Sequence, residues 1–389
     1  MEPIPGGKTD PVIYLNNAAT TWPKPPEVIA EVTNCLQIPF SEHGRSTLGN
    51  TPDYLTDTRD CLSRFFGVDL PDQFVFTSSA TDALNILIQG FEKKAGKPFH
   101  AVTTELEHNS VLRPLHTLET EGKISLSKIS FKKSKVDLST IKKAILPETR
   151  LVVMTHGSNV LGSIQDIQPI AEYLNSNGIY FIVDGAQTAG LIDINLEKIP
   201  VDAFVFTGHK ALFGMPGIGG FFIRDPFSVI QTRYGGTGTE SQNLVQPQAM
   251  PERFEIGTPN YPGIASLLAG IRFIDRIGLD AITDHNKIIT AAFLHEIKTI
   301  NNIELLNPHP ELPVVSLNFG NVENSEAGYI LAKAYNIVTR TGLHCAPLVH
   351  KKLNGGKGAV RASFSWFTTL EEVKKAGAAI REIADSCGS

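Results

Sequence analysis

The chain has 389 residues, with 35 Lys and Arg against 40 Asp and Glu and a formal net charge of −5. Hydrophobic residues make up 42% and charged residues 19%, a balance that is ordinary for a globular protein and excludes predominant disorder. The chain has no run of five like charges, which disfavours nucleic acid as a partner. The length favours two domains over a single core.

Two features of the sequence bear on location and metal binding. Residues 1–10 lack the basic and apolar regions of a signal peptide, and no apolar run reaches the ~18 residues of a membrane span. We therefore expect a cytoplasmic protein with no membrane partner. The four cysteines are Cys35, Cys61, Cys345 and Cys387. None lies in a zinc-like spacing, so we expect no metal site and no disulfide scaffold.

Residues 74–225 alternate short apolar runs with longer amphipathic ones. Helical spacing occurs in Asp82–Phe91 and Ile167–Asn175. Six runs rich in Val, Ile and Phe predict strands: Gln73–Phe76, His100–Thr103, Leu151–Met154, Tyr180–Val183, Ala203–Phe206 and Gly220–Ile223. This order predicts a mostly parallel sheet with helices on both faces. Ligands bind such sheets at the carboxyl ends of the strands.

The remaining elements follow in chain order. Residues 226–265 are rich in Gly, Thr, Gln and Pro, which predicts a long functional loop. A helix is expected over about Ile264–Arg276. The rest of the chain, residues 280–389, predicts a smaller α+β domain with a strand at Val314–Asn318 and a last helix at about Leu370–Ala384.

A charged residue lies at or shortly after the end of two predicted strands. Asp184 is either a turn or N-cap aspartate, or a carboxylate that pairs with a buried cation such as a protonated pyridine nitrogen. Lys210 follows the strand Ala203–Phe206 after Thr, Gly and His. It is either a surface lysine in a loop, or a lysine that forms a Schiff base with an aldehyde cofactor, which would resolve the cost of its burial.

Two further strand ends carry polar residues. The hydroxyl-rich segment 77–81 leads from a strand into a helix, where free N–H groups favour phosphate; the same residues would serve equally as an ordinary cap. The P-loop lysine is missing, which disfavours a nucleoside triphosphate. His108 is either a hydrogen-bonded structural residue, or a ring that stacks on a pyridine and moves protons.

A Gly-containing loop near the C-terminus holds a thiol. Cys345 follows Arg340 and His344, and cations beside a cysteine stabilise its thiolate and make it a better nucleophile. We interpret Cys345 as either a reactive or a structural cysteine. The other three are interpreted as inert, since Cys35 and Cys61 lie in helical patterns and Cys387 lies at the tail.

Together these features supply a cation partner, a Schiff-base lysine, a phosphate cradle, a stacking ring and a nucleophile. The chain resembles the class V aminotransferase group of fold-type I pyridoxal-phosphate (PLP) enzymes, and within it the cysteine desulfurases and selenocysteine lyases. The resemblance covers nearly the whole chain from Tyr14–Thr21 onward. Its most specific matches are Asp184–Gln187 and Gly208–Lys210, while Gly257–Asn260 and Arg340–Cys345 narrow it to desulfurase-like members.

The resemblance implies a fold and a set of partners. The α/β fold would have a large PLP-binding domain at residues 15–265, with a mostly parallel seven-stranded sheet covered by helices. A small α+β domain would comprise residues 1–14 and 266–389. The implied cofactor is PLP and the implied substrate is cysteine or selenocysteine. The implied partners are a second copy, in a homodimer with shared active sites, and a sulfur-acceptor protein.

The resemblance also implies a role for each matching residue. Lys210 would bind PLP covalently, His108 would stack on its ring, and Cys345 would take the sulfur; these three are the expected catalytic residues. Arg361 and Asn159 would bind the substrate. The expected cofactor-binding residues are Ala80, Thr81, Thr207 and His209 at the phosphate, Asp184 at the pyridine nitrogen, Gln187 and Asn159 near the ring oxygen, His108, Lys210, and Thr258 from the second subunit.

The chain departs from the family pattern at three places: Leu343 stands where related desulfurases carry a second His, segment 78–82 is Ser-Ser-Ala-Thr-Asp, and Ala-Pro-Leu-Val-His follows Cys345. These departures bear on the substrate and the sulfur acceptor. We expect a PLP-dependent cysteine desulfurase that forms L-alanine and a persulfide on Cys345. The alternatives are a selenocysteine lyase, another class V C–S lyase or aminotransferase, and a non-catalytic scaffold of this fold.

Overall fold

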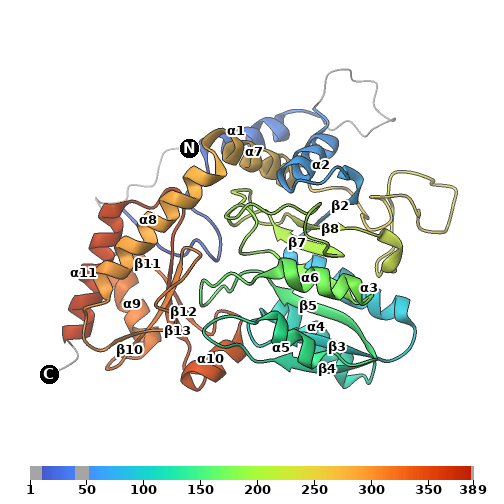
Figure 1. The fold of residues 1–389 in the computed structure, drawn as a ribbon. Helices are drawn as coiled ribbons and strands as arrows, with labels where there is room; N and C mark the ends of the chain where they lie inside the picture. The colour runs from blue at the N-terminus through green and yellow to red at the C-terminus, as the bar shows by residue number, and fades with distance from the viewer. Residues whose placement is uncertain (1–10, 40–51, 387–389) are drawn as a thin grey trace.

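The computed structural model describes residues 11–39 and 52–386 of the chain (Figure 1). Residues 1–10, which the resemblance assigns to the small domain, and Cys387 lie outside the described residues. The described helices are α1 (Pro26–Gln37), α2 (Tyr54–Phe65), α3 (Ala80–Ala95), α4 (Asn109–Thr120), α5 (Leu138–Ala144), α6 (Ile167–Ser176), α7 (Tyr261–Ile277), α8 (Leu279–Ile297), α9 (Asn324–Ala334), α10 (Pro347–Asn354) and α11 (Leu370–Ser386).

A seven-stranded sheet occupies the larger part of the molecule, on the right in Figure 1, in the order β2-β8-β7-β6-β5-β3-β4. Its strands are β2 (Phe74–Thr77), β3 (Phe99–Thr104), β4 (Ile124–Ile129), β5 (Thr149–Thr155), β6 (Tyr180–Asp184), β7 (Ala203–Thr207) and β8 (Gly219–Ile223). Within this sheet β8 runs antiparallel to both neighbours, and the other neighbouring pairs are parallel. The mostly parallel seven-stranded sheet is therefore confirmed.

The six strands predicted from apolar runs are present, with ends that differ by one or two residues. The seventh strand, β4, was not predicted. In β4 only Ile124 and Ile129, its first and last residues, are fully buried, and the four residues between them are more exposed. Its place at the sheet edge explains this pattern. A search for continuous apolar runs therefore misses β4.

Helices cover the large sheet on both faces. Along β7, Phe204 and Phe206 pack with residues of α2, α6 and α7 on one face, while Ala203 and Val205 pack with residues of α3 and α4 on the other. All four side chains are fully buried, and each phenylalanine contributes roughly 1.5–3 kcal/mol by leaving water. Burial on both faces is why the central strands are continuous apolar runs.

The C-terminal part holds a second sheet, on the left in Figure 1. Its strands pair antiparallel in the order β12-β13-β10-β9 and share a core with α8, α9 and α11. The bounds are β9 (Ile303–Leu305), β10 (Val314–Phe319), β11 (Ile337–Val338), β12 (Arg340–Gly342) and β13 (Ala359–Ser363). The strand β1 (Ile13–Tyr14) pairs with β11. The division into domains at residue 265 stays a prediction, and α7 runs through that position.

The predicted long loop is confirmed over residues 226–260, where no strand or α-helix is described and the only regular element is the short 3-10 helix Pro226–Ser228. Residues 261–265 belong to α7 instead, and a functional role of the loop stays a prediction. The α7 helix begins three residues before the predicted start at Ile264. Asn260 explains the difference, because its Oδ1 accepts the N–H of Gly263 at 3.1 Å and so caps the helix at Tyr261.

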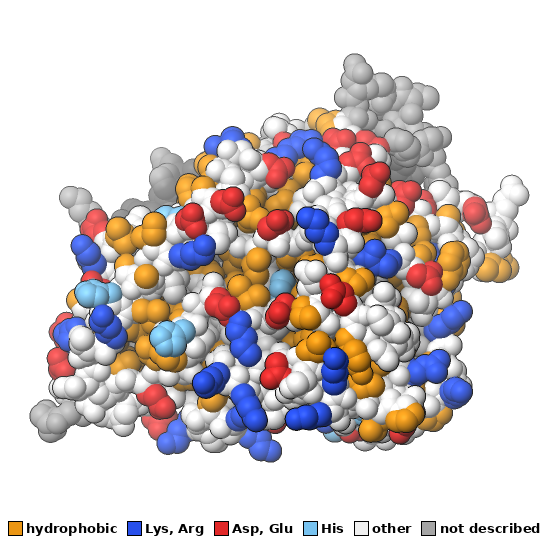
Figure 2. Space-filling view, in the orientation of Figure 1, with side chains coloured by type: hydrophobic (Ala, Val, Ile, Leu, Met, Phe, Trp, Pro, Cys, Tyr) orange, Lys and Arg blue, Asp and Glu red, His pale blue; other side chains and the backbone are white. Residues whose placement is uncertain are grey.

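Acidic and basic side chains are interspersed over the face shown in Figure 2. Across residues 11–39 and 52–386, no helix combines the length and the apolar character required to cross a membrane. The cytoplasmic location stays a prediction.

Candidate active site

Five parallel strands of the large sheet (β2, β3, β5, β6 and β7) end at one edge, where a cavity of about 210 Å³ lies. The C-terminal sheet contributes to this cavity through Arg361 of β13 and Arg340 of β12. Ten residues predicted from the sequence line it: Ala80, Thr81, His108, Asn159, Asp184, Gln187, Thr207, His209, Lys210 and Arg361. The structure therefore brings together segments that lie up to about 280 residues apart in the chain.

Two other predicted residues lie outside this cavity. Cys345 lines a neighbouring cavity of about 460 Å³, which shares Thr81, His108 and Ser110 with the first. Thr258 is exposed and lies in a third cavity, of about 260 Å³, behind the turn between β2 and α3. Within a single chain Thr258 therefore does not reach the cavity of Lys210.

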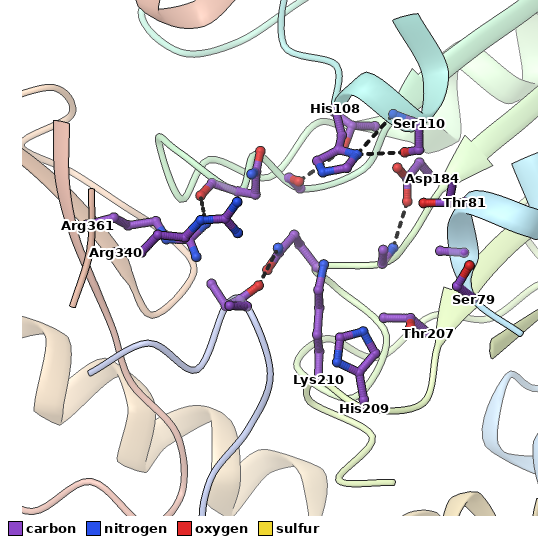
Figure 3. A pocket seen from close by; sticks show the side chains of 18 residues that line it. Ser79, Thr81, His108, Ser110, Asp184, Thr207, His209, Lys210, Arg340 and Arg361 are labelled. Atoms are coloured by element: carbon purple, nitrogen blue, oxygen red, sulfur yellow. Dashed lines mark hydrogen bonds between the residues drawn. The ribbon is translucent and has the colours of Figure 1, made fainter. Parts of the chain in front are cut away.

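Lys210 projects into the middle of the cavity (Figure 3). Burial lowers the pKa of its amine to about 8; the Asp184 carboxylate opposes this shift, and the Arg361 and Arg340 guanidinium groups add to it. A lysine with a lowered pKa holds a larger neutral fraction near pH 7, and the neutral amine is the form that attacks a carbonyl.

Asp184 is the last residue of β6 and is 5% exposed. Burial raises the pKa of its carboxyl group, whereas a hydrogen bond from the Ala186 N–H to Oδ1 (3.0 Å) and the charge of Lys210 lower it. The turn that sequence reasoning offered as an alternative is thus present as well. It anchors one carboxylate oxygen, while the residue still lines the cavity.

One end of the cavity is suited to an anion. Figure 3 places Ser79, Thr81 and Thr207 at the end opposite the two guanidinium groups. The N–H groups in the first turn of α3 have no partners within the helix, so they can bind an anion. Buried polar atoms without a partner among the described residues include Thr207 Oγ1 and His209 Nδ1. Such atoms are costly unless a ligand or water satisfies them.

His108 caps α4 and also lines the cavity. Its Nδ1 accepts the N–H of Ser110 at 3.1 Å and lies 2.8 Å from the Ser110 hydroxyl oxygen. In the neutral ring the proton is therefore on Nε2. Burial, followed by the charge of Lys210, lowers the pKa of His108 to about 4, so the ring is neutral at pH 7. The structural role and a role in the cavity coexist at this residue.

Arg361 is fully buried at the opposite end of the cavity. Its Nη1 donates to the backbone oxygen of Asn159 at 2.9 Å, and Nη2 donates to Asn16 Oδ1 at 3.3 Å. Its Nε has no partner among the described residues. Burial, with the nearby Arg340 charge, lowers the pKa of Arg361 to about 9. A buried guanidinium with a donor left unpaired among the described residues is a site for an anionic group such as a carboxylate.

Cys345 lies in the connection between β12 and α10 as a partly buried free thiol. The Nη2 of Arg340 donates to its Sγ at 3.5 Å. The Asn109 N–H donates to the Cys345 carbonyl oxygen at 2.7 Å. This bond ties the thiol loop to α4, directly after His108.

The residues of this region that sequence reasoning missed include Arg340, Ser110 and Glu107. Arg340 and Ser110 line the cavity, although Arg340 was considered only as a neighbour of the thiol. Glu107 is fully buried next to Thr155, which lines the cavity. Its Oε1 accepts from the Thr104 hydroxyl and from the Thr155 N–H, and burial raises its pKa to about 8. A buried Glu directly before His108 was the available signal. Cys35 and Cys61 lie buried in α1 and α2, as predicted.

The family model of aminotransferase class-V matches residues 13–376. The chain belongs to the class V aminotransferase family. One class V relative, a probable cysteine desulfurase of Pyrococcus abyssi, is 30% identical, and the match covers 98% of this chain and 96% of the relative.

Solved structures of this family share the fold. The apo cysteine desulfurase of Thermococcus onnurineus NA1 is 31% identical, superposes with a TM-score of 0.86, and the match covers 96% of this chain and 95% of that one. A cysteine desulfurase of Escherichia coli is 20% identical and superposes with a TM-score of 0.87. The match covers 97% of this chain and 95% of that one. The fold-type I architecture expected of a class V aminotransferase is thus confirmed.

Proposed function

We propose that this chain is a PLP-dependent cysteine desulfurase, which converts L-cysteine to L-alanine and leaves a persulfide on Cys345. One observation carries the proposal: a free thiol contacting a guanidinium lies beside the cavity that holds Lys210 and Asp184. The family and the full-length cysteine desulfurase relatives agree with it. A transaminase would need Lys210 and Asp184 but has no use for the thiol.

The cavity residues fit PLP. The first turn of α3 and the unpartnered Thr207 Oγ1 suit the phosphate. Asp184, a buried carboxylate at a strand end, suits the pyridine nitrogen. Gln187 faces the same space, where its Nε2 donates to the Ala18 backbone oxygen at 3.1 Å. His108 supplies the ring to stack on the pyridine.

The chemistry that PLP supplies when bound is an electron sink for the Cα of an amino acid. Lys210 would provide the amine that holds the cofactor, and it is placed to move the proton at Cα. Asp184 would hold a proton at the pyridine nitrogen. Arg361 binds the substrate carboxylate and so orients Cα toward Lys210.

Cys345 takes the sulfur. Its thiolate attacks the substrate Sγ, and a sulfur–sulfur bond forms as the substrate Cβ–Sγ bond breaks. The bonding electron pair stays with Cβ, which takes up a proton. Alanine and a persulfide on Cys345 therefore form without an external reductant. An acceptor thiol or a reductant then removes the sulfur.

Two partners belong to this proposal. Thr258 is exposed and does not line the Lys210 cavity of its own chain, and it lies at the end of the long connection before α7. In a homodimer Thr258 reaches the phosphate in the second subunit. Cys345 lies in a loop of only a few residues between β12 and α10, and this short loop suits a separate sulfur-acceptor protein that comes to the thiol.

The test is product analysis with the PLP-loaded protein, L-cysteine and L-selenocysteine. We expect alanine from cysteine, with a mass increase of one sulfur on the peptide that carries Cys345. Alanine from selenocysteine alone would assign a selenocysteine lyase instead. Pyruvate, or an amino-group transfer product, would assign another lyase or an aminotransferase.

A further inference from the structure

The Cys345 loop has an unusual backbone. His344 has φ 51° and Cys345 has φ 57°, so two consecutive side-chain-bearing residues occupy the left-handed region. Each such residue costs about 1–2 kcal/mol relative to right-handed backbone, and it persists only where surrounding contacts impose it. Contacts from outside the loop must therefore hold the thiol in this geometry.

Backbone groups of the loop are held from outside. The Asn159 side chain donates through Nδ2 to the His344 carbonyl oxygen at 2.7 Å. The Asn109 N–H donates to the Cys345 carbonyl oxygen at 2.7 Å. These bonds fix two peptide oxygens, but they leave the orientation of the His344 side chain undetermined.

The His344 ring lies between two partners inside the protein. Its Nε2 is 3.0 Å from the backbone oxygen of Arg340, and its Nδ1 is 3.2 Å from Nε2 of His350, a residue of α10. His344 is 2% exposed and His350 is fully buried. His350 belongs to the Ala-Pro-Leu-Val-His segment after Cys345, for which the proposed mechanism has no use.

The two contacts fix the tautomers of both rings. A carbonyl oxygen can only accept, so the His344 Nε2 carries the proton, and its Nδ1 is bare in the neutral ring. The His350 Nε2 must then be the donor, and its Nδ1 is bare and buried with no partner among the described residues. Burial lowers the pKa of His344 to about 3 and of His350 to about 4, which keeps both rings neutral.

We propose that His350 is a positioning residue for sulfur transfer: its Nε2–H orients the His344 ring, and this ring holds the Arg340 end of the loop against the Cys345 end. Arg340 contributes both the carbonyl oxygen that His344 binds and the guanidinium that contacts the Cys345 Sγ at 3.5 Å. The chain of bonds therefore runs from α10 to the guanidinium beside the thiol. The inference rests on the proposed role of Cys345.

The test compares two amide replacements of His350 in the PLP-loaded enzyme. The side-chain nitrogen of Gln can take the place of Nε2, whereas that of Asn is one bond too short. We expect His350→Asn to slow single-turnover persulfide formation on Cys345 about tenfold, since it leaves a buried acceptor on His344 unpaired. The KM for cysteine should change by less than about threefold. The PLP absorbance band should not change. His350→Gln should restore most of the rate.

His100 provides the matched control. It is 2% exposed and its ring nitrogens lie 2.7 Å from Thr149 Oγ1 and 2.9 Å from Ser127 Oγ, but it lies at the opposite end of β3 from the site. His100→Asn should lower the melting temperature and leave the persulfide rate unchanged. If both Asn variants slow the rate equally, the role of His350 is general stability and the inference is wrong.

Three further outcomes decide the inference. Wild-type rates in His350→Asn would overturn it while leaving the proposed function intact. No persulfide on wild-type Cys345 would overturn the proposed function and this inference together. Should His350→Asn fail to fold, His344→Gln keeps the donor to Arg340 but loses the acceptor for His350. We expect it to show the same tenfold loss, and a wild-type rate there would contradict the inference.

Discussion

The edge of the large sheet and the Cys345 loop hold their functional side chains in different ways. Asp184 and Thr207 are the last residues of buried strands, so the sheet itself positions them. Cys345 has a φ of 57° and lies in no strand or helix. Hydrogen bonds from α4, from α10 and from Asn159, which follows β5, hold its loop. The first region is suited to permanent binding of a cofactor. The geometry of the second region depends on single hydrogen bonds from separate parts of the chain.

The largest effect is expected at the sheet edge, in Lys210→Ala. In the proposed mechanism this change removes both the covalent attachment of PLP and the group that moves the Cα proton, so turnover should fall to background. PLP could still bind through its phosphate, which makes the loss of the absorbance band of the covalent form the first measurement and alanine formation the second. Normal turnover in this variant would show that Lys210 is a loop lysine.

Asp184→Asn should retain the fold and PLP but lose most of the activity, at least tenfold. An amide cannot keep the pyridine nitrogen protonated, so the electron sink is weakened. Because Oδ1 accepts from Ala186, an amide oxygen can preserve the turn. The melting temperature, PLP content and rate should be measured together. Near-wild-type turnover would assign Asp184 to the turn alone.

Arg361→Lys tests a residue that connects the two regions, because Arg361 belongs to the C-terminal sheet but lines the cavity at the edge of the large sheet. An ammonium group cannot reproduce the guanidinium fork that binds Asn159 and Asn16. We expect the KM for cysteine to rise about tenfold, with a smaller change in kcat. A change confined to kcat would place Arg361 with the thiol loop rather than with substrate binding.

The smallest effect is expected for Thr258→Ala, which would remove the phosphate contact that we propose across a dimer. PLP affinity should fall less than tenfold. The same contact predicts that the active species is a homodimer, which sedimentation at decreasing concentration can check. An active monomer at low concentration would refute shared sites.

The difference between the sheet edge and the Cys345 loop also explains which site residues could be predicted from the sequence. Lys210, Asp184, His108 and segment 77–81 could be proposed as site residues because each lies at or shortly after the end of a buried apolar strand, and parallel strands bring such positions to one edge. The strand β4 was missed because an edge strand has a weak apolar pattern. The geometry of the Cys345 loop could not be predicted from the sequence, because it depends on contacts between residues far apart in the chain, such as Asn159 with His344.

The central claim is that Cys345 receives the sulfur, and Cys345→Ser tests it directly. A thiolate is a poor leaving group, so release of sulfur from cysteine needs a nucleophile to take it, whereas a selenol is more acidic and leaves with less help. The measurement is alanine formed from cysteine and from selenocysteine by wild type and variant at equal PLP occupancy. We predict that Cys345→Ser stops alanine formation from cysteine and spares part of any activity on selenocysteine. Alanine from cysteine at the wild-type rate would contradict the account.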